Sequence, residues 1–187
     1  MRKVTKTPST TLFPVPNVLV SSQLGDKANV LTIAWTGIMN SVPPIVYVSI
    51  NPSRFSHKLV QESGEYVINI PSADLARAVD YCGVVSGRDI DKFQATGLTP
   101  VAATQVKAPL IAECPVNIEC RVRQTIELGS HDVFVADVLA VNYSETVLDT
   151  AGRPDLAKLN PYGYCLNEYR ALGEKLGTFG FSQKQPK

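Results

Sequence analysis

The alternation of apolar and polar residues along the chain predicts a protein built mainly from β-strands. Apolar runs of strand length cover residues 16–24 and 29–36, and the turn at residues 25–27 between them indicates a hairpin. A third strand is expected at residues 45–50, where nearly continuous apolar residues predict burial on both faces. Residues 66–70 form a short fourth strand.

Helical spacing is confined to short segments in the first half of the chain. Apolar residues recur at helical intervals across residues 75–82, and we expect Ser72 to cap this helix. Shorter helical patterns occupy residues 59–64 and 89–96. These helices are inserted among strands and do not alternate with them.

Two longer strands follow in the second half. Residues 116–123 alternate between apolar and charged positions, which predicts one buried and one solvated face. Residues 133–141 are apolar on both faces apart from Asp137, and the periodicity is weak from residue 150 onward. Several antiparallel strands with one or two inserted helices favour a small β-barrel over alternating βαβ units.

Composition narrows the possible functions. The 187 residues are 44% hydrophobic and 19% charged with a net charge of +1, which argues against nucleic acid as the main partner. No apolar stretch reaches the roughly 20 residues that a membrane span needs, so we expect a cytoplasmic protein with no membrane partner. The four cysteines form no C-x-x-C pair and only two histidines are present, so no metal site is expected.

The most informative segment is the turn that follows the third strand. It carries Ser53, Arg54, Ser56, His57 and Lys58 directly before a short helical pattern. Hydroxyls, a guanidinium and free N–H groups at a helix N-terminus form a receptor for phosphate, which makes a phosphorylated cofactor one hypothesis. A Ser-capped helix with solvated charges is the other hypothesis, and it is the more common arrangement.

Seven segments resemble, in order, those of flavin reductase-like proteins of the FMN-binding split-barrel superfamily, with the flavoredoxin branch as the nearest. Each is weakly specific alone, but together they span nearly the entire chain. The segments are residues 14–22, 29–37, 43–50, 54–59, 64–71, 82–93 and 129–138. The resemblance implies a single domain over residues 1–187: a Greek-key split barrel of about six strands with a few short helices. It also implies a homodimer with one FMN per subunit near the interface, and a tail from about residue 150 that packs on the barrel or on the partner.

By the same resemblance, the strand at residues 29–35 runs along the flavin edge. Main-chain groups suit this contact because the strand fixes them beforehand, so little entropy is lost on binding. Trp35 is expected beside the ring, against the alternative of core packing, and Thr32 is either a ligand or a plain strand residue. The implied ring contacts are Asn29, Leu31, Thr32, Ile33, Ala34, Trp35, Ser49, Ile50 and Asn51.

The phosphate is expected at Arg54, Ser56 and His57. Lys92 is placed by the resemblance to reach the phosphate or the flavin, although a lone lysine on a turn is otherwise expected on the solvated surface. His131 is expected beside the flavin as a catalytic residue that tunes the potential of the ring, against the alternative of a strand-end histidine bonded to nearby backbone. An aromatic residue over the flavin is implied at Tyr164.

Three functions remain open from the sequence. The first is an FMN-dependent oxidoreductase that takes electrons from NAD(P)H and passes them to an acceptor. The second is a flavoredoxin-type electron carrier that exchanges electrons with a redox protein and does not oxidise NAD(P)H itself. The third is a ligand-binding domain without the cofactor, which the retained site residues argue against. The chain has no G-x-G-x-x-G fingerprint, so the use of NAD(P)H is implied by the resemblance alone.

Overall fold

The computed structural model describes residues 1–183, and its centre is one antiparallel sheet of seven strands in the order β2-β1-β5-β8-β9-β4-β3. Each strand pairs antiparallel with its neighbours, so the chain is connected by hairpins and by longer crossovers. The strands are β1 (Val18–Leu24), β2 (Lys27–Ile33), β3 (Thr36–Ser41), β4 (Pro44–Ile50), β5 (Glu65–Ile70), β8 (Val116–Glu127) and β9 (Asp132–Tyr143).

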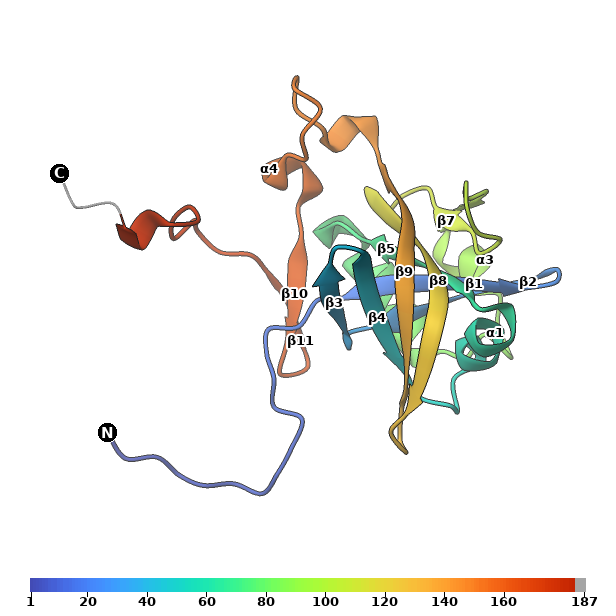
Figure 1. Cartoon of the computed structure of the whole chain (residues 1–187), viewed down its shortest axis with the longest axis horizontal. Helices are drawn as coiled ribbons and strands as arrows, with labels where there is room; N and C mark the ends of the chain where they lie inside the picture. The colour runs from blue at the N-terminus through green and yellow to red at the C-terminus, as the bar shows by residue number, and fades with distance from the viewer. Residues whose placement is uncertain (184–187) are drawn as a thin grey trace.

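The sheet curls around a single apolar core. Leu31 and Ile33 of β2 pack in the same buried cluster as Val46 and Val48 of β4, although these strands lie near opposite ends of the sheet order. A flat sheet would keep them far apart, so the shared core requires a barrel-like curvature, which is visible in Figure 1. The prediction of a mainly β protein is confirmed.

Short helices cover one side of this barrel. They are α1 (Phe55–Ser63), α2 (Ala76–Val84), which follows the 3-10 turn η1 (Ala73–Leu75), and α3 (Lys92–Thr96). Val79 and Cys82 of α2 and Phe93 of α3 pack against the outer faces of β1 and β2 in a second buried cluster. This places the ends of three helices and their loops along β2.

Smaller elements complete the chain. They are β6 (Pro100–Val101), β7 (Leu110–Ile111), the 3-10 turn η2 (Glu145–Val147), α4 (Leu156–Leu159), β10 (Tyr162–Cys165), β11 (Glu168–Ala171) and the 3-10 turn η3 (Phe181–Gln183). β10 and β11 form a hairpin whose Tyr162 and Tyr169 reach the second cluster. Residues 1–14 and 172–183 are exposed and leave the barrel on the same side (Figure 1). No helix of the described residues is long and apolar enough to cross a membrane.

The structure corrects several expectations. β4 alternates between buried and half-buried residues, because one of its faces lines a cavity instead of a second core. β3 was not predicted, because its exposed Ile38, Met39 and Asn40 carry no alternation. Ser72 precedes η1, but its side chain makes no capping hydrogen bond there.

Candidate functional site

A cavity of about 300 Å³, the main crevice, opens where β2, β4, α2 and β9 approach one another. The sequence predicts most of its lining, from segments that are far apart along the chain. The lining residues are Leu31, Thr32, Ile33, Ala34, Trp35, Ser49, Asn51, Arg54, Gly83 and His131. Its wall includes the last residues of β2, and β2 is an edge strand paired only with β1. The outer N–H and C=O groups of β2 are therefore outside the sheet ladder.

Trp35 and His131 form the aromatic end of the main crevice. Their ring centroids lie 4.6 Å apart at an interplanar angle of 43°. Trp35 is 41% exposed, so core packing does not account for it. His131 Nδ1 lies 3.1 Å from the hydroxyl of Ser130, and its Nε2 makes no hydrogen bond within residues 1–183. The strand-end alternative for His131 therefore lacks the backbone bond that it required.

The hydroxyl of Thr32 donates its hydrogen bond within the protein and not to a ligand. Its Oγ1 donates to the carbonyl oxygen of Val79, which ties α2 to β2. Gly83, one turn further along α2, lies so close that an added Cβ would come within 3.3 Å of the Thr32 Cβ. A larger residue at Gly83 would press against the Thr32 side chain, so this glycine lets α2 pack closely on β2 at the wall of the main crevice. No sequence pattern indicated a role for Gly83.

A second cavity, the side pocket, continues from the main crevice past Leu31 and Arg54, which line both. It measures about 130 Å³. The residues that line it are mostly polar or cationic, and they come from β2, α1, α3 and the loop before α3. The expected site residues among them are Asn29, Leu31, Arg54, Ser56 and Lys92, and Ser53 belongs to the turn that was expected to receive a phosphate. Gly87 and Arg88 were not expected in the site.

The N-terminus of α1 faces this side pocket without a cap. Arg54 occupies the N-cap position, and its side chain makes no capping hydrogen bond. The amides of Phe55 and Ser56 have no hydrogen-bond acceptor in the part of the chain that the structure describes. The alternative of a Ser-capped helix is therefore wrong, and the helix offers free N–H groups and its positive dipole end to the pocket.

Ser56 and Asn29 form the polar floor of the side pocket. Both are buried, and the Asn29 amide donates a hydrogen bond of 2.8 Å to the Ser56 hydroxyl oxygen. The Ser56 hydroxyl still has a proton to donate, because a hydroxyl donates and accepts. Arg54 stands at the junction of the two cavities, and its guanidinium makes no ion pair or hydrogen bond among residues 1–183. Arg54 is thus a free cation beside a buried hydroxyl.

Lys92 is a buried cation, in contrast to the expected surface alternative. Lys92 is only 2% exposed, and its ammonium donates to the carbonyl oxygens of Val30 at 2.9 Å and Cys82 at 2.7 Å. An ammonium has three donors, so one remains for the side pocket that Lys92 lines. Burial lowers the pKa of Lys92 to about 8; the nearby Cys82 opposes the shift and Arg54 adds to it.

Three predicted residues lie elsewhere. His57 is buried against Asp132, with Nε2 and Oδ2 2.7 Å apart. Successive residues of α1 point about 100° apart, so Ser56 faces the pocket and His57 faces away from it. Ile50 belongs to the barrel core. Tyr164 donates to Asn167 Oδ1 at 3.1 Å in the β10–β11 hairpin. These three residues line neither the main crevice nor the side pocket.

Comparison with known proteins bears directly on this pair of cavities. The model of the family described as "Flavin reductase like domain" matches residues 10–173. The structure of the flavoredoxin of Desulfovibrio vulgaris (Miyazaki F) is 34% identical and covers 98% of this chain and 100% of its own, with a TM-score of 0.90. The flavoredoxin from Methanosarcina acetivorans is 30% identical, with 98% of both chains covered and a TM-score of 0.89. A protein of Pyrococcus abyssi is 39% identical over 145 residues, 78% of this chain and 83% of that protein. The predicted fold class is confirmed.

Proposed function

The chain belongs to the Flavin reductase like domain family, and from that premise we propose that it binds FMN and transfers electrons through it as an oxidoreductase. Membership of this family supports a flavin cofactor and a redox function. The single observation that carries the choice of FMN is the continuity of the two cavities. A crevice with an aromatic end opens into a small cationic pocket at Arg54, which fits a flat ring joined to a terminal phosphate.

The main crevice suits the ring. Unpaired backbone groups along the edge of β2 would pair with the polar edge of the isoalloxazine, and they are held in place before binding. Trp35 supplies an exposed aromatic face, and an offset aromatic contact contributes about 0.5–1.5 kcal/mol beyond area burial. The crevice thus offers both an apolar face and directional hydrogen bonds.

The side pocket suits the phosphate. The Arg54 guanidinium, the Ser56 hydroxyl, the Lys92 ammonium and the free amides of α1 converge on it. Hydrogen bonds to a charged group contribute roughly 1.5–3 kcal/mol each. Three or four of them account for much of the roughly 8 kcal/mol that micromolar affinity requires.

His131 is the proposed catalytic residue. The chemistry that FMN supplies when bound is reversible uptake of a hydride or of single electrons. His131 is held by Trp35 and Ser130 at the mouth of the main crevice, with Nε2 free. From there it would donate a hydrogen bond or a proton toward the reduced ring and so raise its tendency to accept electrons.

Two donors are compatible with this site. The first is NAD(P)H, as in a flavin reductase. The second is a redox protein, as in a flavoredoxin-type carrier, and the likeness to two flavoredoxins at 34% and 30% identity favours keeping it as the second candidate. Anaerobic mixing of the FMN-loaded protein with NADH or NADPH separates them. Fast bleaching of the flavin absorbance identifies a reductase, and bleaching only by a reduced protein donor identifies a carrier.

We also propose that the protein is a homodimer. Leu172, Leu176 and Phe179 follow β11 on an extended segment and are strongly exposed. Ile38 and Val42, in and just after edge strand β3, are exposed as well. Apolar side chains presented in this way are typical of subunit interfaces. Light scattering on the purified protein tests this, and the mass of a single chain at micromolar concentration would contradict it.

A further inference from the structure

The side pocket is separated from a third cavity, here called the outer groove, of about 650 Å³. Asn29, Phe55, Gly87, Arg88 and Lys92 line both cavities, so the boundary between them consists of these residues. The charged residues that line the outer groove are three carboxylates, Asp26, Asp89 and Asp91, and three cations, Lys27, Arg88 and Lys92. A ligand tail that continued beyond the side pocket would have to cross this boundary.

Gly87 makes the tightest contact in the boundary. A Cβ added there would lie 2.1 Å from Asn29 Oδ1, so only a glycine permits this approach without displacing the amide. That amide is buried and is already committed to Ser56. The loop before α3 and the floor of the side pocket are therefore in direct contact.

Arg88 closes the same boundary from the solvent side. Its Nη1 donates a 2.9 Å hydrogen bond to the carbonyl oxygen of Ser53, which joins the loop to the turn before α1. The hydroxyl of Ser86 accepts from the Arg88 amide at 3.2 Å, so the loop is itself ordered by a local turn. Arg88 is exposed, and it spans the gap through which a longer tail would leave.

We propose that the Gly87–Asn29 contact and the Arg88–Ser53 hydrogen bond form a partition that selects a terminal phosphate monoester, and therefore FMN, over a pyrophosphate-linked flavin such as FAD. A monoester ends inside the side pocket. A pyrophosphate must displace the partition, which means breaking the hydrogen bond between Arg88 and Ser53 and moving Gly87 away from Asn29. The inference rests on the proposed function, because it concerns the same site.

The test compares FMN and FAD titrations of the wild-type protein with those of Arg88→Ala, Arg88→Lys and Gly87→Ala. We expect the wild type to prefer FMN. Arg88→Ala should shift the ratio of the two affinities toward FAD by about tenfold, which corresponds to roughly 1.4 kcal/mol. Arg88→Lys keeps the charge without the fork that bridges to Ser53, so it should shift the ratio in the same direction. Gly87→Ala should weaken FMN and leave riboflavin nearly unchanged.

The matched control is Arg77→Ala, because Arg77 is exposed on α2 and lines none of the three cavities. It should leave the ratio unchanged. An Arg88→Ala protein that is folded by thermal melting and keeps the wild-type ratio would overturn the partition. A wild-type protein that binds no flavin would refute the proposed function instead. In that case thermal stabilisation by inorganic phosphate against pyrophosphate still tests the partition: a preference for phosphate that Arg88→Ala loses supports it, and equal stabilisation, or none, overturns it.

Discussion

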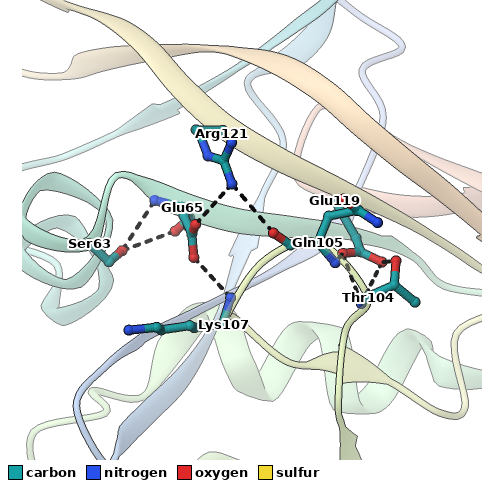
Figure 2. Close-up of polar contacts among 7 residues, drawn as sticks. All are labelled: Ser63, Glu65, Thr104, Gln105, Lys107, Glu119 and Arg121. Atoms are coloured by element: carbon teal, nitrogen blue, oxygen red, sulfur yellow. Dashed lines mark hydrogen bonds and ion pairs between the residues drawn. The ribbon is translucent and has the colours of Figure 1, made fainter.

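Two loops pack on the barrel beside buried charged side chains. At the first loop the charged groups are hydrogen-bonded within the protein, and at the second some of their donors have no partner among residues 1–183. The first is the strap, residues 102–109 between β6 and β7, which crosses β8 (Figure 2). Glu119 of β8 has 0% exposure, and its carboxylate accepts from the amides of Thr104 and Gln105, the Thr104 hydroxyl and the Asn142 amide at 2.5–3.1 Å. Glu65 adds a 2.9 Å bond from the amide of Lys107.

The second loop, residues 85–91, borders the side pocket. Beside this loop, the Arg54 guanidinium makes no hydrogen bond or ion pair among residues 1–183, and the Lys92 ammonium keeps a free donor although it is buried. Burial alone would raise the pKa of Glu119, but the hydrogen bonds from Asn142, Thr104 and Gln105 hold that pKa below its ordinary value. The pKa of Lys92 is lowered as well, but for a cation a lower pKa favours the neutral form, whereas for the Glu119 carboxylate it favours the charged form. A buried charge whose hydrogen bonds are all made within the protein indicates a structural role. Several charged groups with free donors that face one cavity indicate a binding site.

The largest expected effect is on the strap. Glu119→Ala leaves the amides of Thr104, Gln105 and Asn142 without their acceptor, and we expect it to lower the free energy of unfolding by about 3 kcal/mol. Urea unfolding measures this loss. The matched control is Glu62→Ala, whose ion pair with Lys58 is exposed and should contribute less than about 1 kcal/mol. Equal losses in both variants would show that the strap is not fastened by Glu119.

Arg54→Ala should have the opposite profile. It removes a cation that has no internal partner, so we expect unfolding of the protein without flavin to be nearly unchanged. The affinity for FMN should fall by about ten- to a hundredfold, the range for losing a hydrogen bond to a charged group, and the affinity for riboflavin should fall much less. Fluorescence titration with both ligands measures this difference.

Lys58→Ala is the control for charge on the same helix, because Lys58 pairs with Glu62 outside the pocket. If riboflavin and FMN lose affinity equally in Arg54→Ala, the phosphate is not bound at Arg54, and the assignment of the side pocket is wrong.

The two regions also differ in how far the sequence predicts them. The wall of the main crevice from Leu31 to Trp35 was predictable because its residues are consecutive along β2 and just beyond it, where one strand fixes many contacts at once. The strap was not, because Glu119 is a charged residue in an alternating strand, and alternation places it in solvent. The strap covers Glu119 of β8, and no local pattern of residues 102–109 predicts where they fold back.

The side pocket shows the same limit on a smaller scale. Ser56 and His57 are neighbours in a turn, and the sequence does not state which of them faces the ligand; the helical rotation at α1 decides it, and His57 goes to Asp132. The turn around Lys92 favours the solvated surface, and only the family resemblance places Lys92 in the site; its bonds to β2 and α2 bury it. Gly87 had a usable signal, because a glycine in a polar loop often marks a close backbone approach, here to Asn29.

The smallest expected effect is a dependence of FMN affinity on pH, which should arise at the side pocket and not at the strap. Lys92 is protonated below its pKa of about 8 and neutral above it, so the side pocket loses a positive charge as the pH rises through this value. The phosphate of FMN is already a dianion there, because its second pKa is about 6. We therefore expect FMN affinity to fall severalfold, at most about tenfold, between pH 7 and 9, the loss of one charge-assisted hydrogen bond.

Riboflavin is the control ligand, because it lacks the phosphate and should keep its affinity over the same range. The strap supplies the internal control. The pKa of Glu119 lies below its ordinary value, so the carboxylate is fully charged throughout and the unfolding difference between the wild type and Glu119→Ala should stay constant from pH 7 to 9. If the affinities for FMN and for riboflavin are both constant from pH 7 to 9, Lys92 does not bind the phosphate. The side pocket would then depend on Arg54 and the amides of α1 alone.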